Sequence, residues 1–343
     1  MRKIKVVQIG IGHDHASSIL ESMLRQPEIF QVCGLVAPET EACDFEEAVT
    51  YYRDQFHVPL LSLSEAFDID DLDAAVIETE EKNLTKYAHL AAEHGLHIHM
   101  DKPGGFDKDA FAELVSLVRG KGLVFSLGYM YRYNPYVQEA LRKAKSGELG
   151  EIYSVEAHMG GEHGKQKREW LQRLPGGMMF FLGCHLVDLI YQLQGSPMEV
   201  IPMSTSTGYQ GVTSLDYGMA LFKYKNGVSF AKACVAEPGG FLRRQLVICG
   251  TKGTVEIKPL EINMDTTAPD YHDGDQLTKY RETYATGLWN HQGEEKTTEM
   301  YNRYDGMMES FAKYVCGEKE NPYSYDYELE LYKLILRACG EEV

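Results

Sequence analysis

Positive charge is scarce in this sequence. Its 343 residues contain 34 lysines and arginines against 51 aspartates and glutamates, which gives a formal net charge of −17. Binding to nucleic acid or to an anionic membrane surface depends on clustered cations, so we expect neither kind of partner. No apolar run approaches the roughly 20 residues that span a bilayer. The apolar stretch after Arg2 and Lys3 is broken by Gln8 and Gly10, and we therefore expect no signal peptide.

Paired cysteines are also missing. The seven cysteines are an odd number and form no Cys-x-x-Cys motif, which is typical of reduced thiols in a cytoplasmic protein. No low-complexity tract or internal repeat occurs. With 44% hydrophobic residues, a chain of this length can bury sizeable cores without disulfides, and we predict two domains.

Residues 1–128 alternate between short apolar runs and helical periods. This alternation predicts a parallel sheet that is covered by helices and joined by right-handed crossovers. Strands are predicted near 4–9, 31–36, 73–77, 97–100 and 123–127, with helices near 14–25, 80–94 and 107–121.

After residue 128 the pattern changes to turns and paired strands. Asn226-Gly227 lies between two apolar runs, which is a strong hairpin signal, and a second pair of runs flanks 250–253. This pattern predicts an α+β domain with a mostly antiparallel sheet. The other predicted elements are a strand near 151–159 and helices near 135–145, 178–193, 305–315 and 326–339.

The first predicted strand runs directly into Gly10-Ile11-Gly12 and a helix. In a Rossmann phosphate turn the first glycine makes the tight bend, the second lets a pyrophosphate approach, and the helix N-terminus supplies N–H groups. We therefore predict a dinucleotide site at Gly10 and Gly12 that includes His13, Asp14 and His15. His15 occupies the third glycine position of the motif, which weakens the match.

The end of the second predicted strand bears on the choice of cofactor. The acidic residue expected there is replaced by Ala37, and Glu39 could reach the ribose hydroxyls from the loop. No cation follows closely to accept a 2′-phosphate, so the pattern favours NAD without excluding NADP. Glu78 and Thr79 are further cofactor candidates, although a helix dipole alone favours acids there. A Rossmann-like domain without a nucleotide stays an alternative.

Several motifs occur in one order along the chain: the Gly-x-Gly turn, Asp101-Lys102-Pro103, Gly128-x-x-x-Arg132-x-x-Pro135, Trp170 ahead of Gly176-Gly177, Gly183-x-His185-x-x-Asp188, and Gly250-Thr251-x-Gly253. Together they resemble the glucose–fructose oxidoreductase and inositol dehydrogenase superfamily (Gfo/Idh/MocA). The resemblance implies an N-terminal Rossmann domain over 1–128 and an α+β domain with a large, mostly antiparallel open sheet over 129–325. A C-terminal helix over 326–343 has room to pack back on the first domain.

The resemblance also implies an activity: NAD(P)-dependent oxidation or reduction of a hydroxyl carbon of a sugar, cyclitol or related polyol. It assigns the reacting oxygen and its proton to Lys102 and His185. A histidine titrates near neutral pH and can take the alcohol proton, while an ammonium group stabilises the developing alkoxide. Asp101, which replaces the usual glutamate of the motif, is expected to bind the cofactor, as is Lys102.

One departure from the family pattern concerns the base. The family often has an aspartate four residues before the histidine, where this chain has Phe181. Helical spacing allows Asp188 to contact His185 from the next turn, so Asp188 is a candidate orienting residue. The resemblance places the substrate pocket at Tyr129, Tyr131, Arg132, Tyr133, His158, His163, Lys165 and Trp170, for which ordinary packing or a solvated loop is the alternative.

The histidine pairs His13/His15 and His97/His99 suggest a metal, but no third ligand is apparent, and we expect none. Two other functions stay open: a non-catalytic relative that binds nucleotide or sugar as a sensor or partner protein, and a redox-assisted glycoside-cleaving enzyme without net NAD turnover. An open sheet must cover its exposed face, so we expect a homodimer or homotetramer.

Overall fold

A computed structural model describes residues 1–38, 45–261, 278–297 and 302–343 of the chain. These residues form two compact units. Met1–Met130 and Arg303–Tyr332 make up the first unit, and Tyr131–Asn302 and Lys333–Val343 make up the second. The division differs from the predicted boundaries at the C-terminal end, because residues 303–325 lie with the first unit. No helix of the described segments is long and apolar enough to cross a membrane.

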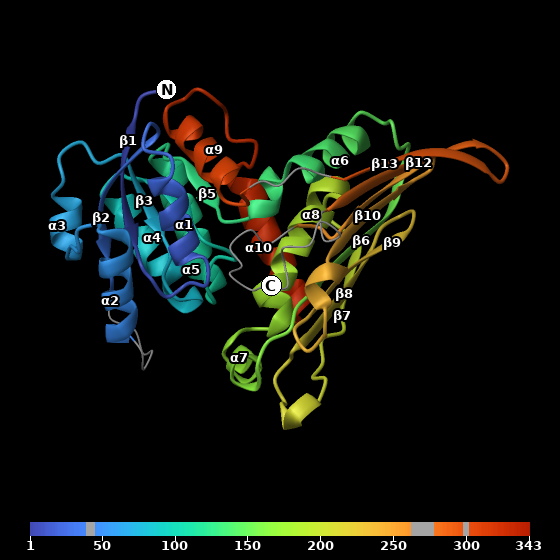
Figure 1. Cartoon of the computed structure of the whole chain (residues 1–343), viewed down its shortest axis with the longest axis horizontal. Coiled ribbons are helices and arrows are strands. Elements are labelled where there is room, and N and C mark those ends of the chain that lie inside the picture. The colour runs from blue at the N-terminus through green and yellow to red at the C-terminus, as the bar shows by residue number, and fades with distance from the viewer. Residues whose placement is uncertain (39–44, 262–277, 298–301) are drawn as a thin grey trace. The chain divides into compact units, whose positions relative to one another are not determined.

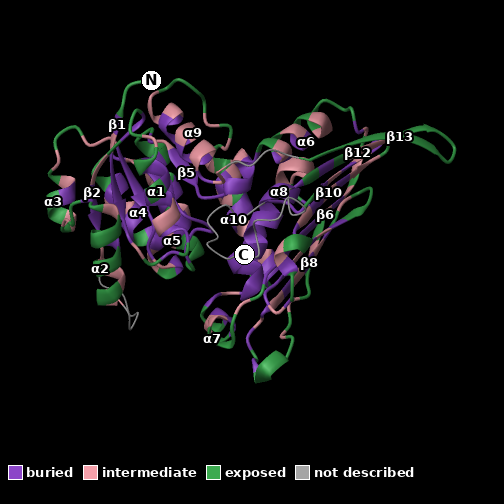
Figure 2. Cartoon of the chain, in the orientation of Figure 1, coloured by how far each residue is buried: buried purple, intermediate pink, exposed green. Residues whose placement is uncertain are grey.

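The first unit is built on a five-stranded parallel sheet with the order β2-β1-β3-β4-β5 (Figure 1). The strands are almost entirely buried, as expected for a parallel sheet with both faces covered (Figure 2). The strand order reverses at β1, so ligands should bind at the carboxyl ends of β1 and β3. The strands are β1 (Ile4–Ile9), β2 (Phe30–Val36), β3 (Ala74–Ile77), β4 (His97–Met100) and β5 (Phe125–Leu127).

The helices of the first unit include two that the sequence pattern did not predict, α2 and α3. Helix α9 comes from the far end of the chain and packs against α1, where Asp305 accepts hydrogen bonds from Ser22 (2.7 Å) and Arg25 (2.9 Å). The helices are α1 (Ala16–Leu24), α2 (Phe45–Phe56), α3 (Leu63–Phe67), α4 (Leu84–Glu93), α5 (Lys108–Gly120) and α9 (Asp305–Val315). Helix α10 (Tyr325–Cys339) begins in the first unit and ends in the second.

The second unit contains an eight-stranded sheet with the order β13-β12-β11-β10-β6-β9-β8-β7. Every described strand pair in it is antiparallel except β6 with β9, which confirms the predicted mostly antiparallel sheet. The turn at Asn226-Gly227 joins β8 to β9, and Gly227 takes a φ of 110°. The strands are β6 (Ile152–Gly160), β7 (Glu199–Pro202), β8 (Tyr217–Lys223), β9 (Val228–Cys234), β10 (Gln245–Gly250), β11 (Gly253–Lys258), β12 (Lys279–Gly287) and β13 (Asn290–Thr297).

One face of this sheet carries α8 (Cys184–Gln194), which packs on β6 and β9. The other helices of the second unit are α6 (Pro135–Lys145) and the short α7 (Lys165–Trp170). Helix α6 begins at Pro135, with the Asn134 side chain capping the backbone N–H groups of Tyr136 and Val137.

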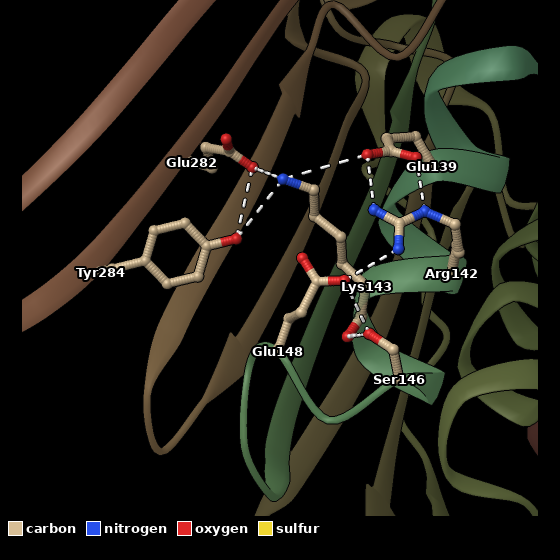
Figure 3. A network of polar contacts seen from close by, with 7 residues as sticks. All are labelled: Glu139, Arg142, Lys143, Ser146, Glu148, Glu282 and Tyr284. Carbon is tan, nitrogen blue, oxygen red and sulfur yellow. Dashed lines mark hydrogen bonds and ion pairs between the residues drawn. The ribbon is translucent and has the colours of Figure 1, made fainter.

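A charged network fastens α6 to β12 (Figure 3). Lys143 on α6 bonds to Glu282 on β12 and lies 3.9 Å from Glu139, while Arg142 is 2.9 Å from Glu139 and 2.8 Å from Glu148. Lys143 and Glu282 are each only 12% exposed, so their pairing is better shielded from water than an ordinary surface ion pair.

Candidate active site

The phosphate turn follows β1 and rests against the end of β3. Gly10 has a φ of 112°, and a Cβ there would lie 2.4 Å from the backbone of Glu78 and Thr79. The backbone N–H groups of Gly12 and His13 both donate to the Glu78 carbonyl oxygen at 3.1 Å. Only glycine fits the first position, because both the backbone conformation and the contact exclude a side chain.

A small hollow opens at this turn. Its lining includes Gly10, Gly12, Thr79, Asn83 and Tyr87. The first two glycines of the motif therefore border open space, which fits the close approach of a pyrophosphate. Asn83 and Tyr87 were missed in the sequence reading. The signal was that both follow the third strand, whose carboxyl end meets the same edge of the sheet.

The other predicted cofactor residues have different surroundings. Asp14 is exposed, and Ala37 is half-buried beside Pro38, which also lines the hollow. Glu39 lies outside the described residues. His15 does not line the hollow but turns toward the buried Asp101. The third position thus departs from a glycine without filling the hollow.

Four buried titratable side chains meet beside the turn. The Nδ1 atoms of His13 and His15 lie 3.1 and 3.0 Å from Oδ2 of Asp101, and Oε2 of Glu78 lies 3.9 Å from His13 Nδ1. Burial acts to raise the pKa of Asp101, but the two imidazoles outweigh it and hold that pKa well below its usual range. Burial lowers the pKa of His15 to about 4 against the opposing charge of Asp101.

The adjacent carboxyl group titrates in the opposite direction. Burial, reinforced by the charge of Asp101, raises the pKa of Glu78 well above its ordinary value. The two carboxyl groups are therefore shifted apart, because the imidazoles favour the ionised form of Asp101 while burial disfavours that of Glu78. The sequence predicted Asp101 and Glu78 separately and did not predict that they adjoin.

Lys102 follows Asp101 at the carboxyl end of β4 and is fully buried. Its backbone N–H donates to Asp101 Oδ1 at 2.6 Å. Gly128, the first residue of the predicted motif at the end of β5, leaves room for this carboxylate, since a Cβ there would lie 2.7 Å from Oδ1. The motif lysine is thus joined to the phosphate turn through its neighbour Asp101.

In the second unit, His185 lies on α8 and is 1% exposed. Its ring meets the ring of Tyr131 edge-on, with centroids 5.3 Å apart and an interplanar angle of 84°. The Tyr131 hydroxyl donates to Glu261, which also accepts a hydrogen bond from Arg244 at 2.6 Å. Tyr131 is therefore anchored at its far end while its ring orients the candidate base. Lys102 and His185 belong to different units.

Asp188 has a partner that helical spacing did not predict. Arg132 donates to both carboxylate oxygens at 2.8–3.1 Å, and each of the two side chains is 1% exposed. Gln192 adds a hydrogen bond to Oδ2 at 2.9 Å. Such a bidentate pair fixes both side chains in one orientation. Arg132, predicted as a substrate residue, therefore holds α8 to the segment that carries Tyr131.

Phe181 lies in a π-helical segment, Met179–Gly183, directly before α8. Its ring meets Trp170 edge-on with centroids 5.5 Å apart, and the Lys167 ammonium lies 4.0 Å from the Trp170 centroid and 4.8 Å from that of Phe181. Phe181, at the position where the resemblance implied an aspartate, thus forms with Trp170 an aromatic pair that binds the Lys167 ammonium. Single-turn π segments in helices are frequent at functional sites.

The remaining predicted pocket residues divide into buried and exposed ones. His158 on β6 faces Glu237 at 3.2 Å and is 5% exposed, while Lys165 is exposed. Burial lowers the pKa of His158, and the charge of Lys232 acts in the same direction. A hollow beside α7 is lined in part by His163, Lys165 and Tyr209. Tyr129 is 1% exposed, and Tyr133 is half-buried.

Arg168, three positions after the exposed Lys165, is fully buried. It donates to Asp216 at 3.2 Å and to the Tyr209 carbonyl oxygen at 3.0 Å, and it also bonds to Gln210. A buried guanidinium with these partners ties α7 to the loop after β7. No pattern in the sequence distinguished Arg168 from its exposed neighbours.

Residues 137–256 match the family model described as the GFO/IDH/MocA C-terminal domain. The predicted resemblance to this family is thereby confirmed, and the solved structures agree in fold. A putative NADPH-dependent oxidoreductase from Desulfitobacterium hafniense superposes with a TM-score of 0.79 at 16% identity, covering 99% of this chain and 95% of that one.

Two curated relatives match this chain over part of their length. The uncharacterized oxidoreductase YhhX of Escherichia coli is 30% identical over 194 residues, which cover 56% of this chain and 54% of the relative. The D-xylose 1-dehydrogenase (NADP(+)) 2 of Haloferax volcanii is 26% identical over 207 residues, which cover 57% and 63%. The matches thus span between half and two thirds of these relatives.

Proposed function

We propose that this chain is an NAD(P)-dependent oxidoreductase that acts on a hydroxyl-bearing carbon of a sugar, cyclitol or related polyol. The observation that carries the proposal is the link within the first unit between Lys102 and the phosphate turn. Lys102 is buried after β4, and the adjacent Asp101 contacts His15 at 3.0 Å. A buried ammonium beside a dinucleotide turn suits the stabilisation of an alkoxide next to a nicotinamide. The family match and the dehydrogenase among the relatives support the same chemistry.

The proton belongs to His185 in this proposal. Its neutral imidazole takes the hydroxyl proton as the substrate is oxidised and returns it in the reverse direction. A bound dinucleotide supplies the hydride acceptor. Asp188 acts as a positioning residue, because it holds Arg132, whose neighbour Tyr131 packs edge-on against His185. Lys102 stabilises the charge that appears on the oxygen.

NAD is the dinucleotide we expect, with NADP as the alternative. Ala37 removes the usual ribose acid, and the predicted role of Glu39 is untested. The relative from Haloferax volcanii is named for NADP, so both forms require measurement. Gly10, Gly12 and Thr79 border the hollow that would receive the pyrophosphate.

The substrate we propose is polyhydroxylated and anionic. The hollow beside α7 offers His163, Lys165, Tyr209 and Gln210, which combine an aromatic face with donors and a positive charge. Trp170 and Lys167, whose ammonium group lies over the Trp170 ring, are both on α7. We further propose a homodimer or homotetramer, for which light scattering is the test, and a monomer would contradict it.

The experiment begins with fluorescence titration of the purified chain with NADH and NADPH, followed by a turnover screen over sugars, sugar acids and cyclitols. We expect Lys102→Met and His185→Ala to lower turnover by about 10²–10⁴-fold, the usual range for a proton-transfer group, while dinucleotide binding persists. Lys108→Met and His291→Ala, both at exposed positions, are the matched controls.

The outcomes separate the alternatives. Unchanged turnover in both Lys102→Met and His185→Ala would reject the assigned roles. Dinucleotide binding without turnover of any substrate would favour a sensor or partner protein. Consumption of a glycoside without accumulation of NADH would favour the redox-assisted cleavage reaction.

A further inference from the structure

Three side chains from two distant segments converge at the start of α1. His13 and His15 come from the phosphate turn, and Asp101 follows β4. One ligand atom of each lies within 4.8 Å of the others, and Asp101 Oδ2 is 3.1 Å from His13 Nδ1 and 3.0 Å from His15 Nδ1. Imidazole nitrogens and carboxylate oxygens bind zinc at about 2.0–2.2 Å, which places neighbouring ligands of a tetrahedral site about 3.3–3.6 Å apart. The carboxylate lies a few tenths of an ångström closer to each imidazole than this spacing, so small side-chain shifts would let the three groups share a cation.

A fourth oxygen donor borders this cluster. The Glu78 side chain is completely buried, and its Oε2 lies 3.9 Å from His13 Nδ1. No hydrogen-bond donor among the described residues reaches either of its carboxyl oxygens. Asp101 already accepts hydrogen bonds, but a second carboxyl group buried beside it is costly unless a cation or a hydrogen bond satisfies it. Glu78 is thus an observation independent of the histidines, and it points to the same ligand.

The carboxylate of the cluster is oriented before any ion arrives. Asp101 Oδ1 accepts the backbone N–H of Lys102 at 2.6 Å, which leaves Oδ2 directed at the imidazoles. The His15 ring rests against Tyr304, with centroids 5.5 Å apart. Groups behind the ligands that fix their direction are a regular feature of metal sites.

We propose that His13, His15 and Asp101 bind a divalent transition-metal ion, with Glu78 as the fourth ligand. Two imidazoles and a carboxylate form the donor set of zinc and of non-haem iron sites, whereas magnesium and calcium prefer oxygen alone. The site also accounts for a bulky histidine at the third glycine position of the turn. This inference goes beyond the proposed oxidoreductase, because an ion can bind there with no dinucleotide or substrate present.

The experiment measures metal binding by the full chain after treatment with EDTA and dialysis. Zinc chloride is titrated by calorimetry, and cobalt chloride by visible absorption. We expect one zinc ion per chain. We also expect a cobalt spectrum with d–d bands but no thiolate charge-transfer band, because the ligands are nitrogen and oxygen. The dinucleotide titration is run separately on the EDTA-treated protein, so failure of one proposal does not imply failure of the other.

The variants locate the ion. His15→Ala and Asp101→Asn each remove a ligand and should weaken zinc binding by more than the roughly 10–100-fold that loss of an outer partner costs. His291→Ala, an exposed histidine on β13, should bind as the wild type does. Circular dichroism and thermal melts check that each variant is folded, and His13→Ala replaces any variant that is not.

Two results would overturn the proposal. One is the absence of saturable zinc or cobalt binding by the wild type. The other is binding by His15→Ala and Asp101→Asn with wild-type affinity, which would place the ion elsewhere, for example on cysteines.

Discussion

Removing the charge of Asp188 should strongly destabilise the second unit. Asp188 and Arg132 are each 1% exposed and share three hydrogen bonds of 2.8–3.1 Å. Asp188→Asn keeps the size of the side chain but removes the carboxylate that pairs with the buried Arg132 guanidinium. Breaking a buried pair by removing one partner costs about 3–5 kcal/mol, because the charge of the other partner loses its compensation away from water.

The assay is urea unfolding followed by fluorescence and circular dichroism. If the two units unfold in separate transitions, the shift should fall on the transition of the second unit. The double variant Arg132→Met/Asp188→Leu replaces the pair with apolar groups of similar volume and should recover most of the loss. An Asp188→Asn protein within about 1 kcal/mol of the wild type would refute the reasoning, since such a value is typical of exposed pairs. So would a double variant as unstable as the sum of the two single changes.

Three other substitutions test separate features. Gly10→Ala should abolish dinucleotide binding and destabilise the first unit, because the new Cβ would lie 2.4 Å from backbone atoms. Gly95 has a positive φ but open space around it, so Gly95→Ala should show only the backbone strain of about 1–3 kcal/mol in urea unfolding. Lys143→Met should lower the free energy of unfolding by about 1–3 kcal/mol, because Glu282, which is nearly buried, loses its ion pair with Lys143. Lys223→Met breaks an exposed pair with Glu199 and should lower it by less than about 1 kcal/mol. Equal losses in urea unfolding would contradict this difference. The pKa of His158 is lowered in the folded state, so the unfolded chain binds the proton first as the pH falls. The stability of the protein should therefore decrease as the pH drops below about 6.5. The urea midpoint of His158→Asn should decrease less over this range, and an identical decline would contradict the assignment.

The sequence was sufficient where local chemistry decides structure. The run at 4–9 and the following glycines predicted β1 and its turn, and Asn226-Gly227 predicted the hairpin of β8 and β9. Helix α9 has the predicted bounds of 305–315. In each case one short segment carries the full signal, either an apolar period or a turn that needs a positive φ.

Other elements carry no such signal. Both faces of β13 are exposed, so its side chains show no apolar alternation, and β13 was not predicted. Residues that meet only through the sheet were also beyond reach. Asp101 joins His13 because the carboxyl ends of β4 and β1 share an edge, and Arg132 reaches Asp188 across 56 positions of sequence. Helical spacing suggested Asp188 as a neighbour of His185, but it could not reveal the bond to Arg132, because spacing contains no information about partners far along the chain.

The contact of Asp101 with the histidines couples the position of Lys102 to that of the phosphate turn. Asp101 bonds to the backbone of Lys102 on one side and to His15 on the other. A displacement of the turn is therefore transmitted to the lysine, and the lysine cannot be repositioned without straining the turn. Substitutions in the turn should consequently register in kcat as well as in KM, so a defect that begins in cofactor binding would be measured as a defect in chemistry.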